Sequence, residues 1–322
     1  MTNIPVKKRY IEIDALKGFA IFLVILGHCV ITGPINLHEN VYCKALVDFV
    51  TTVHVPLFFI VSGFCFSYKN GYKDFIIKKV SRILVPYIVF NVVYILLVQL
   101  LPQFINGQTT LKRAIYGTLL FGDNTCWFLY AMFIIFLVYP LIYKYLLKSR
   151  AMIVITTAVL LVLAIIRPKI AIFNLYDCIY YLFFFHIGVL LKMSKINFFD
   201  IKLNIKHILV FVVSSIVWVV LSFAPFRLWV LIPAALVGSI VCFYLTRFNF
   251  FNKFFAPFGE FSLQLYLLNG YTLVVSRTII CRITDLPSVI VLFNLAIDFF
   301  LSYIIIKYVC KKIPVVNTLM GM

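Results

Sequence analysis

Long apolar runs alternate with short polar connections along the whole chain. A membrane-spanning helix needs about 20 mostly apolar residues, and ten runs approach or reach that length. The pattern therefore predicts an all-α, polytopic transmembrane helix bundle. The predicted spans have their cores at residues 14–33, 44–67, 80–101, 125–147, 151–167, 178–192, 207–223, 228–246, 261–279 and 287–307.

Composition supports a membrane protein. The 322 residues are 64% hydrophobic and 12% charged, whereas soluble domains carry about 25% charged residues. The longest connection, 102–125, is too short for a separate soluble domain, so we expect residues 1–322 to form one transmembrane domain. The basic start before the first run resembles a signal peptide, but no small-x-small cleavage site follows, which predicts a retained first span.

The distribution of charge predicts an orientation. The formal net charge is +18, which in a soluble protein would suggest a nucleic-acid partner. Here roughly three quarters of the lysines and arginines fall in the connections on one side, as the positive-inside rule requires of cytoplasmic loops. No basic stripe is combined with an aromatic platform, so nucleic-acid binding is not expected. We predict a multi-pass cell-membrane protein with both termini cytoplasmic.

The first span, "IDALKGFAIFLVILGHCV", carries ionisable residues at membrane depth. His28 lies eleven residues after Lys17, which in a helix is about 16 Å deeper and only about 20° away around the axis. Asp14 lies within about 60° of both. Charged or ionisable residues inside a span are costly and mark functional sites by default. A polar stripe is therefore predicted from the cytoplasmic mouth to the membrane midplane, with a functional role for His28.

The second span contains "HVPLFFIVSGF". His54 lies about 15 Å below its outer end, at a depth similar to that of His28. Pro56 is expected to kink the helix one turn deeper. Ser62 and Gly63 would allow close packing or the approach of a ligand. A functional and a structural role for His54 are equally compatible with the sequence.

The other histidines and the cysteines favour structural roles. We expect His186 to be a buried structural residue, His38 to lie in a loop and His207 at an interface. No histidine stands at metal-ligand spacing from Cys, Asp or Glu, so no metal is predicted. The eight cysteines form no C-x-x-C pair and are interpreted as small buried hydrophobic residues.

A basic cluster, "KDFIIKKVSRILVPY", begins the third span. Lys79 and Arg82 are three residues apart and share a helix face. They are either ordinary positive-inside anchors or a binding site for a cytoplasmic polyanion such as the phosphates of a nucleotide-type donor.

Several motifs together resemble the acyltransferase-3 membrane family, and most closely its fucose 4-O-acetylase-like branch. The resemblance extends over nearly the whole chain, and the first two motifs carry it in combination. The motifs are Arg9 to Gly18 followed by Gly27-His28, "HVPLFFIVSGF", Lys79-Val-Ser-Arg82 with Pro86-Tyr87, Trp127-Phe128-Leu129, and "FGEFSLQLYLLNGY".

The resemblance implies ten helices, a cytoplasmic acyl-CoA donor, and transfer of the acyl group to a glycan or lipid-linked sugar. The family's essential histidine matches His28, and its basic first-span positions match Arg9 and Lys17. Two positions depart from the family pattern. Lys79 replaces the first arginine of an R-x-x-R motif, and Asn269 stands where the family has a late histidine.

These observations give a hypothesis for the site. Acetyl-CoA is the expected donor, bound through its phosphates, and His28 acts either as a general base or as a nucleophile that forms an acyl-histidine. The donor contacts are Arg9, Lys17, Lys79 and Arg82; the catalytic residues are His28 and His54; the acceptor contacts are Asp14, Ser62, Trp127 and Asn269.

Alternatives remain at three points. Trp127 either stacks on a sugar ring or is an ordinary interfacial aromatic residue. The whole chain is either an acyltransferase or a transporter or flippase that uses the same polar residues, and an inactive scaffold is a third interpretation. Membrane lipids are expected partners, and homo-oligomerisation is left open.

Overall fold

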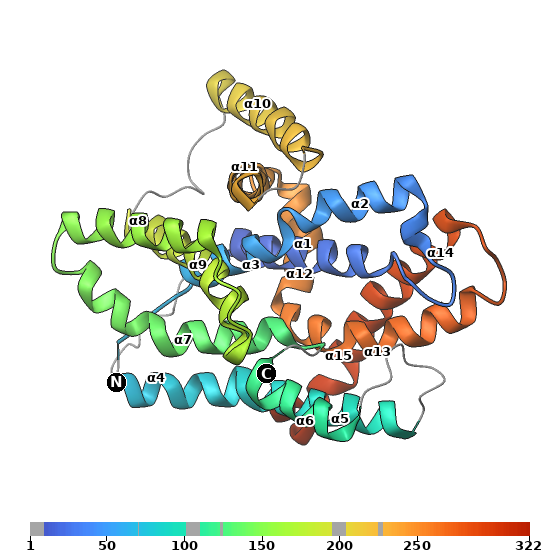
Figure 1. Ribbon diagram of the computed structural model, residues 1–322. Coiled ribbons are helices and arrows are strands. Elements are labelled where there is room, and N and C mark those ends of the chain that lie inside the picture. Colours follow the sequence, from blue (N-terminus) through green and yellow to red (C-terminus); the bar gives the residue numbers. More distant parts are fainter. Residues whose placement is uncertain (1–9, 70, 101–109, 123–124, 195–203, 225–227) are drawn as a thin grey trace, which may run out of the picture.

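The structure is a computed structural model that describes residues 10–69, 71–100, 110–122, 125–194, 204–224 and 228–322. Every regular element in these ranges is helical, as the hydropathy pattern predicts, and most of the long helices lie side by side (Figure 1). The α-helices are α1 (Ile11–His28), α2 (Val41–Thr51), α3 (His54–Phe64), α4 (Tyr72–Lys79), α5 (Val85–Leu100), α6 (Leu111–Tyr116), α7 (Trp127–Leu146), α8 (Arg150–Ile166), α9 (Leu175–Met193), α10 (Ile205–Ser222), α11 (Leu228–Leu245), α12 (Asn249–Glu260), α13 (Ser262–Ile280), α14 (Pro287–Leu295), α15 (Ser302–Tyr308) and α16 (Pro314–Leu319).

Short 3₁₀ and π turns connect or continue these helices. The 3₁₀ turns are η1 (Leu37–Glu39), η4 (Ile172–Asn174) and η6 (Cys310–Lys312). The π turns are η2 (Val80–Leu84), η3 (Gly117–Phe121) and η5 (Ala296–Leu301). Two of the π turns join helices into longer rods: η2 joins α4 to α5, and η5 joins α14 to α15.

Each of the ten predicted spans overlaps a helix or a pair of consecutive helices. Within the described ranges, six helical segments are long and apolar enough to cross a membrane, and the bent pair α11–α12, with an angle of 109° between its two helices, can be counted as a seventh. Helix α8 is apolar but shorter than these segments. Helices α1 and α13 are long enough to cross a membrane, but they are more polar than the six segments. The total of ten and the cytoplasmic termini therefore remain predictions.

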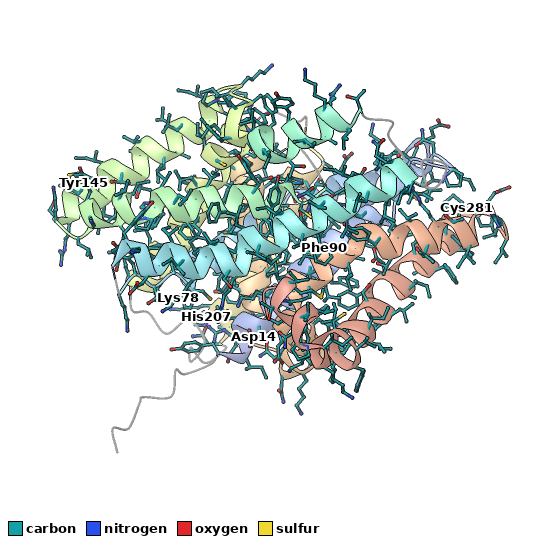
Figure 2. The ribbon with its side chains drawn as sticks, turned by 90° about the horizontal axis from the view of Figure 1, so that it is seen from below. Asp14, Lys78, Phe90, Tyr145, His207 and Cys281 are labelled. Atoms are coloured by element: carbon teal, nitrogen blue, oxygen red, sulfur yellow. The ribbon has the colours of Figure 1, made fainter. Side chains whose placement is uncertain are left out.

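The ends of the bundle can be followed in Figure 2. Lys78 of α4 and Tyr145 of α7 lie at one end, Cys281 after α13 lies at the other, and Phe90 of α5 lies between them. The orientation predicted from the sequence also places Lys78 and Tyr145 on one side of the membrane and Cys281 on the other.

The second predicted span is interrupted beside its histidine. Helix α2 ends at Thr51 and α3 begins at His54. Pro56 lacks the amide hydrogen that would bond to the carbonyl of Thr52, and its ring crowds that carbonyl. The helix therefore breaks just before His54, whereas the sequence predicted a kink one turn deeper than His54. His54 consequently stands at the first position of a new helix.

Helix α12 was not predicted. Its stretch, "NFFNKFFAPFGE", is too short to span a membrane and falls between two predicted spans. Phe251, Ala256 and Phe258 are buried, and Phe251 and Phe255 form edge contacts with Phe19 of α1. The helix supports α1 along the half that carries Lys17.

Two helix crossings bring backbone against backbone at glycines. A Cβ on Gly18 would lie 2.0 Å from the Phe255 carbonyl oxygen, and one on Gly259 would lie 1.7 Å from that of Asp14. The α3–α9 crossing repeats this arrangement. There a Cβ on Gly63 would lie 1.9 Å from the Phe185 carbonyl oxygen, and a Cβ on Gly188 would lie 1.9 Å from that of Ile60. Small residues at helix interfaces allow such close approach in membrane proteins.

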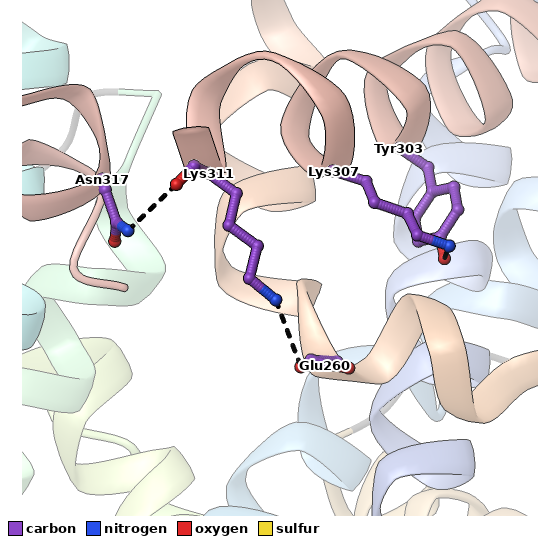
Figure 3. Close-up of polar contacts among 5 residues, drawn as sticks. All are labelled: Glu260, Tyr303, Lys307, Lys311 and Asn317. Atoms are coloured by element: carbon purple, nitrogen blue, oxygen red, sulfur yellow. Dashed lines mark hydrogen bonds and ion pairs between the residues drawn. The ribbon is translucent and has the colours of Figure 1, made fainter. Parts of the chain in front are cut away.

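The segment after α15 turns back onto the bundle (Figure 3). Lys311 Nζ lies 3.9 Å from Glu260 Oε1, and the Lys311 carbonyl accepts a hydrogen bond from Asn317 Nδ2. Met320 follows α16, and its carbonyl accepts a hydrogen bond from the buried Gln264 side chain at 3.0 Å. These contacts hold residues 310–322 against α12 and the start of α13.

Candidate active site

A cavity of about 1010 Å³ opens among α1, α3, α5, α7 and α13. It is at the upper end of the roughly 300–1,000 Å³ range of small-molecule pockets. Lys17, Glu260 and Gly321 line one end, and His28 lies further along the same wall. Because α1 is an unbroken helix between Lys17 and His28, the two residues are separated by about 16 Å along its axis.

Six of the predicted site residues line this cavity. They come from four helices that are far apart in the sequence: Lys17, His28, His54, Ser62, Trp127 and Asn269. Asp14, Lys79 and Arg82 are not among the lining residues. Arg9 lies outside the described residues.

His28 is the last residue of α1 and is exposed to the cavity. Its Nδ1 is hydrogen-bonded to the amide of Asn269, which is 2% exposed. If Nδ2 of Asn269 donates, Nδ1 of His28 accepts and the neutral ring carries its proton on Nε2. If the amide is turned over, its oxygen accepts from Nδ1–H and Nε2 becomes a base. In the described structure Asn269 Oδ1 is buried without a hydrogen-bond partner.

His54 has a tautomer that geometry fixes. Its Nδ1 lies 2.6 Å from the carbonyl oxygen of Val50, and a carbonyl only accepts, so Nδ1 must carry the proton. In the neutral ring Nε2 is then unprotonated. Both rings line the same cavity. The cavity thus holds one imidazole with a fixed base nitrogen and a second whose tautomer depends on Asn269.

The predicted donor contacts divide into two groups. Lys17 Nζ lies at the cavity end, 3.8 Å from Asp14 Oδ1. Lys79 packs instead over the Phe136 ring, with its Nζ 3.6 Å from the ring centroid. Arg82 is exposed, and its backbone carbonyl would lie 2.6 Å from a Cβ at Gly321.

Aromatic side chains form part of the cavity wall where the start of α7 meets α13. Trp127, the first residue of α7, lies with its ring 5.7 Å from that of Tyr181. The next residue, Phe128, packs against Tyr266 with a ring separation of 5.4 Å. Both Trp127 and Tyr266 line the cavity. Their ring faces suit apolar contacts with a ligand, whereas the Tyr266 hydroxyl already donates a hydrogen bond to the carbonyl of Thr125.

His186 lies away from the cavity lining. It is fully buried, with Tyr139 Oη 2.9 Å from Nδ1 and Thr157 Oγ1 2.9 Å from Nε2. Both ring nitrogens are therefore satisfied. This environment is the one expected of a structural histidine.

Replacing His186 by leucine is expected to lower stability but to leave the chemistry intact. The change leaves the buried Tyr139 hydroxyl without this partner, at a cost of about 1–3 kcal/mol. The unfolding temperature in detergent and acyl transfer should be measured on one preparation. Loss of transfer at unchanged stability would show that the structural assignment is wrong.

One buried acid was missed in the sequence. Asp298, in the π turn η5, is fully buried and accepts a hydrogen bond from Thr272 Oγ1. It is the single acidic residue in the predicted span 287–307. That isolation at membrane depth was the available signal. Among the described residues, no group of three or more His, Cys, Asp or Glu is arranged to hold a metal.

The fold and the site define an apolar helical bundle with two histidines in an internal cavity. The acyltransferase-3 family model, described as an acyltransferase domain, matches residues 10–307. The chain belongs to this family and is a membrane acyltransferase. No curated protein and no solved structure matches the chain.

Proposed function

We propose that the chain is an O-acyltransferase of the fucose 4-O-acetylase-like branch. It moves an acetyl group from cytoplasmic acetyl-CoA to a hydroxyl of a cell-surface or lipid-linked glycan. The proposal includes ten spans, cytoplasmic termini and a place in the cell membrane. The observation that carries it is one cavity that joins Lys17 at its end to His28, His54 and Asn269 further along.

Donor recognition rests on charge at the cavity end. Lys17 lines the cavity, and Lys79 and Arg82 lie on the rod formed by α4, η2 and α5. Cationic side chains there attract the phosphates of the donor. The thioester would extend along α1 towards His28, in the apolar part of the cavity.

The two histidines supply the proton chemistry. In one route a histidine Nε2 takes the proton of the acceptor hydroxyl, the oxygen attacks the thioester carbonyl, and the proton returns to the departing thiolate of CoA. In the other, His28 Nε2 attacks first and forms an acyl-histidine, releasing the thiol, and the acceptor hydroxyl then displaces the imidazole. Both routes need an unprotonated Nε2. Trp127, Ser62, Asp14 and Asn269 are the proposed acceptor contacts.

Labelled acetyl-CoA distinguishes this function from transport. Membranes that contain the chain should transfer label to glycan, and surface-glycan O-acetyl content should fall when the gene is removed. A transporter or flippase, which would use the same residues, would move substrate without transferring label. Absence of label from every acceptor fraction, with the chain inserted normally, would overturn the proposal.

Replacing Lys79 and Arg82 together by glutamine is expected to weaken donor binding more than acceptor binding. Losing charge-assisted contacts to phosphate should raise the KM for acetyl-CoA about tenfold, which corresponds to about 1.4 kcal/mol. Replacement of Lys144 and Lys148 by glutamine is the matched control, because it removes two basic residues near Tyr145 at the same end. An unchanged KM for acetyl-CoA would refute the basic-patch role.

A further inference from the structure

One face of α13 carries three polar side chains in a largely apolar bundle. Asn269, Thr272 and Ser276 are spaced by three and four residues and so share a face. Each side chain bonds to a different element: Asn269 to His28 of α1, Thr272 to Asp298 of η5, and Ser276 to Asn294 of α14 at 2.9 Å. These bonds fix the rotation of α13 against three neighbours.

Among the partners of these three side chains, Asp298 has the highest free-energy cost of burial. It is fully buried, and its Oδ2 has no hydrogen-bond partner in the described ranges. Within those ranges no lysine or arginine forms an ion pair with it. Burying a carboxyl group without full compensation is expensive, and apolar packing would join two helices at less cost. Packing of α13 against η5 therefore does not by itself explain why an aspartate occupies this position.

The location of Asp298 supplies that reason. Thr272, which it binds, lies one turn after Asn269, and the Thr272 hydroxyl is also 3.3 Å from the Asn269 carbonyl. Ser302 Oγ donates to Thr272 Oγ1 at 3.2 Å and holds the threonine from the other side. Asp298 is also near enough to Cys29, the residue after His28, to interact with it electrostatically. It belongs to a π turn, a feature frequent at functional sites.

We propose that Asp298 is a positioning residue for His28. Through Thr272 it fixes the rotation of α13, which sets the Asn269 amide against Nδ1 of His28. With the amide oxygen turned towards Nδ1–H, Nε2 is held as the unprotonated nitrogen that both routes need. Asp298 does not line the cavity and takes no part in bond making. Hydrogen bonds weaken steeply with misalignment. A small rotation of α13 would therefore weaken the bond between Asn269 and His28, and the His28 ring would populate both tautomers. The proposed consequence for catalysis rests on the proposed function; the effect on the tautomer does not.

The test compares Asp298→Leu, Asp298→Asn and Thr272→Val. Nitrogen-15 NMR of the histidine rings in purified protein reports the tautomer, with the His28 signals assigned by their loss in His28→Gln. We expect one His28 tautomer in the wild type and in Asp298→Asn, which keeps an acceptor for Thr272. We expect a mixture in Asp298→Leu and Thr272→Val. Thr272→Val keeps the side-chain shape and provides the result if Asp298→Leu fails to fold.

Ser276→Ala is the matched control, because it removes a buried hydroxyl on the same face one turn further from His28. It should leave the His28 spectrum unchanged. Unchanged His28 signals in folded Thr272→Val would overturn the proposal, and so would an equal change in Ser276→Ala. These readouts need no activity and therefore test the positioning role separately from the proposed reaction.

The kinetic consequence is a loss in kcat at constant donor KM. Asp298→Leu should lower kcat about 10- to 100-fold, the range expected for coupled residues. In an Asn269→Ala background the same change should have little further effect, because the group through which it acts is gone. Additive losses would indicate that Asp298 acts by general stabilisation and would overturn its role through Asn269.

Discussion

Replacing His28 by alanine is expected to lower acyl transfer by about 10²–10⁴-fold, the usual contribution of a positioned acid or base. His28 is exposed to the cavity and bonded to a buried amide, so its removal takes away the reactive nitrogen and disturbs little packing. Membrane insertion and donor KM should stay the same. Transfer is measured with labelled acetyl-CoA on membranes that carry equal amounts of protein.

The result is read beside His186→Leu, which removes a buried histidine that does not line the cavity. Full transfer by a normally inserted His28→Ala protein would contradict a catalytic role. Acid-quenched wild-type protein that retains label on a histidine would identify the nucleophilic route. Label that passes directly to the acceptor, with none on the protein, would identify the general-base route.

Replacing Gly188 by alanine is expected to destabilise the whole bundle. The new Cβ would lie 1.9 Å from the Ile60 carbonyl oxygen, so α3 and α9 must move apart. Overpacking a core typically costs about 1–3 kcal/mol, and here the atom in the way is backbone and cannot change rotamer. We expect a lower unfolding temperature in detergent, followed by fluorescence. Because α3 carries His54 and Ser62, transfer should fall with it.

Gly270→Ala is the matched control for this change. Gly270 is also a helical glycine, and a Cβ there meets nothing within 4 Å. Its unfolding temperature should be unchanged or slightly higher, because alanine favours a helix more than glycine does. Equal unfolding temperatures for the Gly188→Ala and wild-type proteins would mean that the close crossing does not contribute to stability.

Helical periodicity alone predicted the central geometry of the site. The eleven-residue spacing of Lys17 and His28 placed both on one face, and both line the cavity. His54 was expected at a similar depth and lines the same cavity. The shared face of Lys17 and His28 agrees with the prediction because it depends on local geometry: in the unbroken helix α1 the sequence spacing fixes the angle between the two residues. The depth of His54 in the membrane stays a prediction.

Contacts between distant parts of the chain could not be predicted in this way. Asn269 is hydrogen-bonded to His28 although 241 positions separate them in the sequence. The sequence pattern of α1 or α13 does not predict which other helix it contacts. The packing of Lys79 over Phe136 is equally non-local. Helix α12 was missed because its aromatic residues cover another helix rather than span the membrane. Asp298 was visible as a lone acid, but its role depends on neighbours that only the fold supplies.

The return of residues 310–322 to the bundle has a practical consequence for protein production. Gly321 lines the cavity at the end that holds Lys17 and Glu260, and Met320 is anchored by Gln264. An affinity tag fused after Met322 would therefore begin one residue from the cavity wall. If the tagged protein has a high KM for acetyl-CoA, the tag could be the cause instead of the enzyme itself. A tag placed in a connection at the opposite end of the bundle would remove that ambiguity.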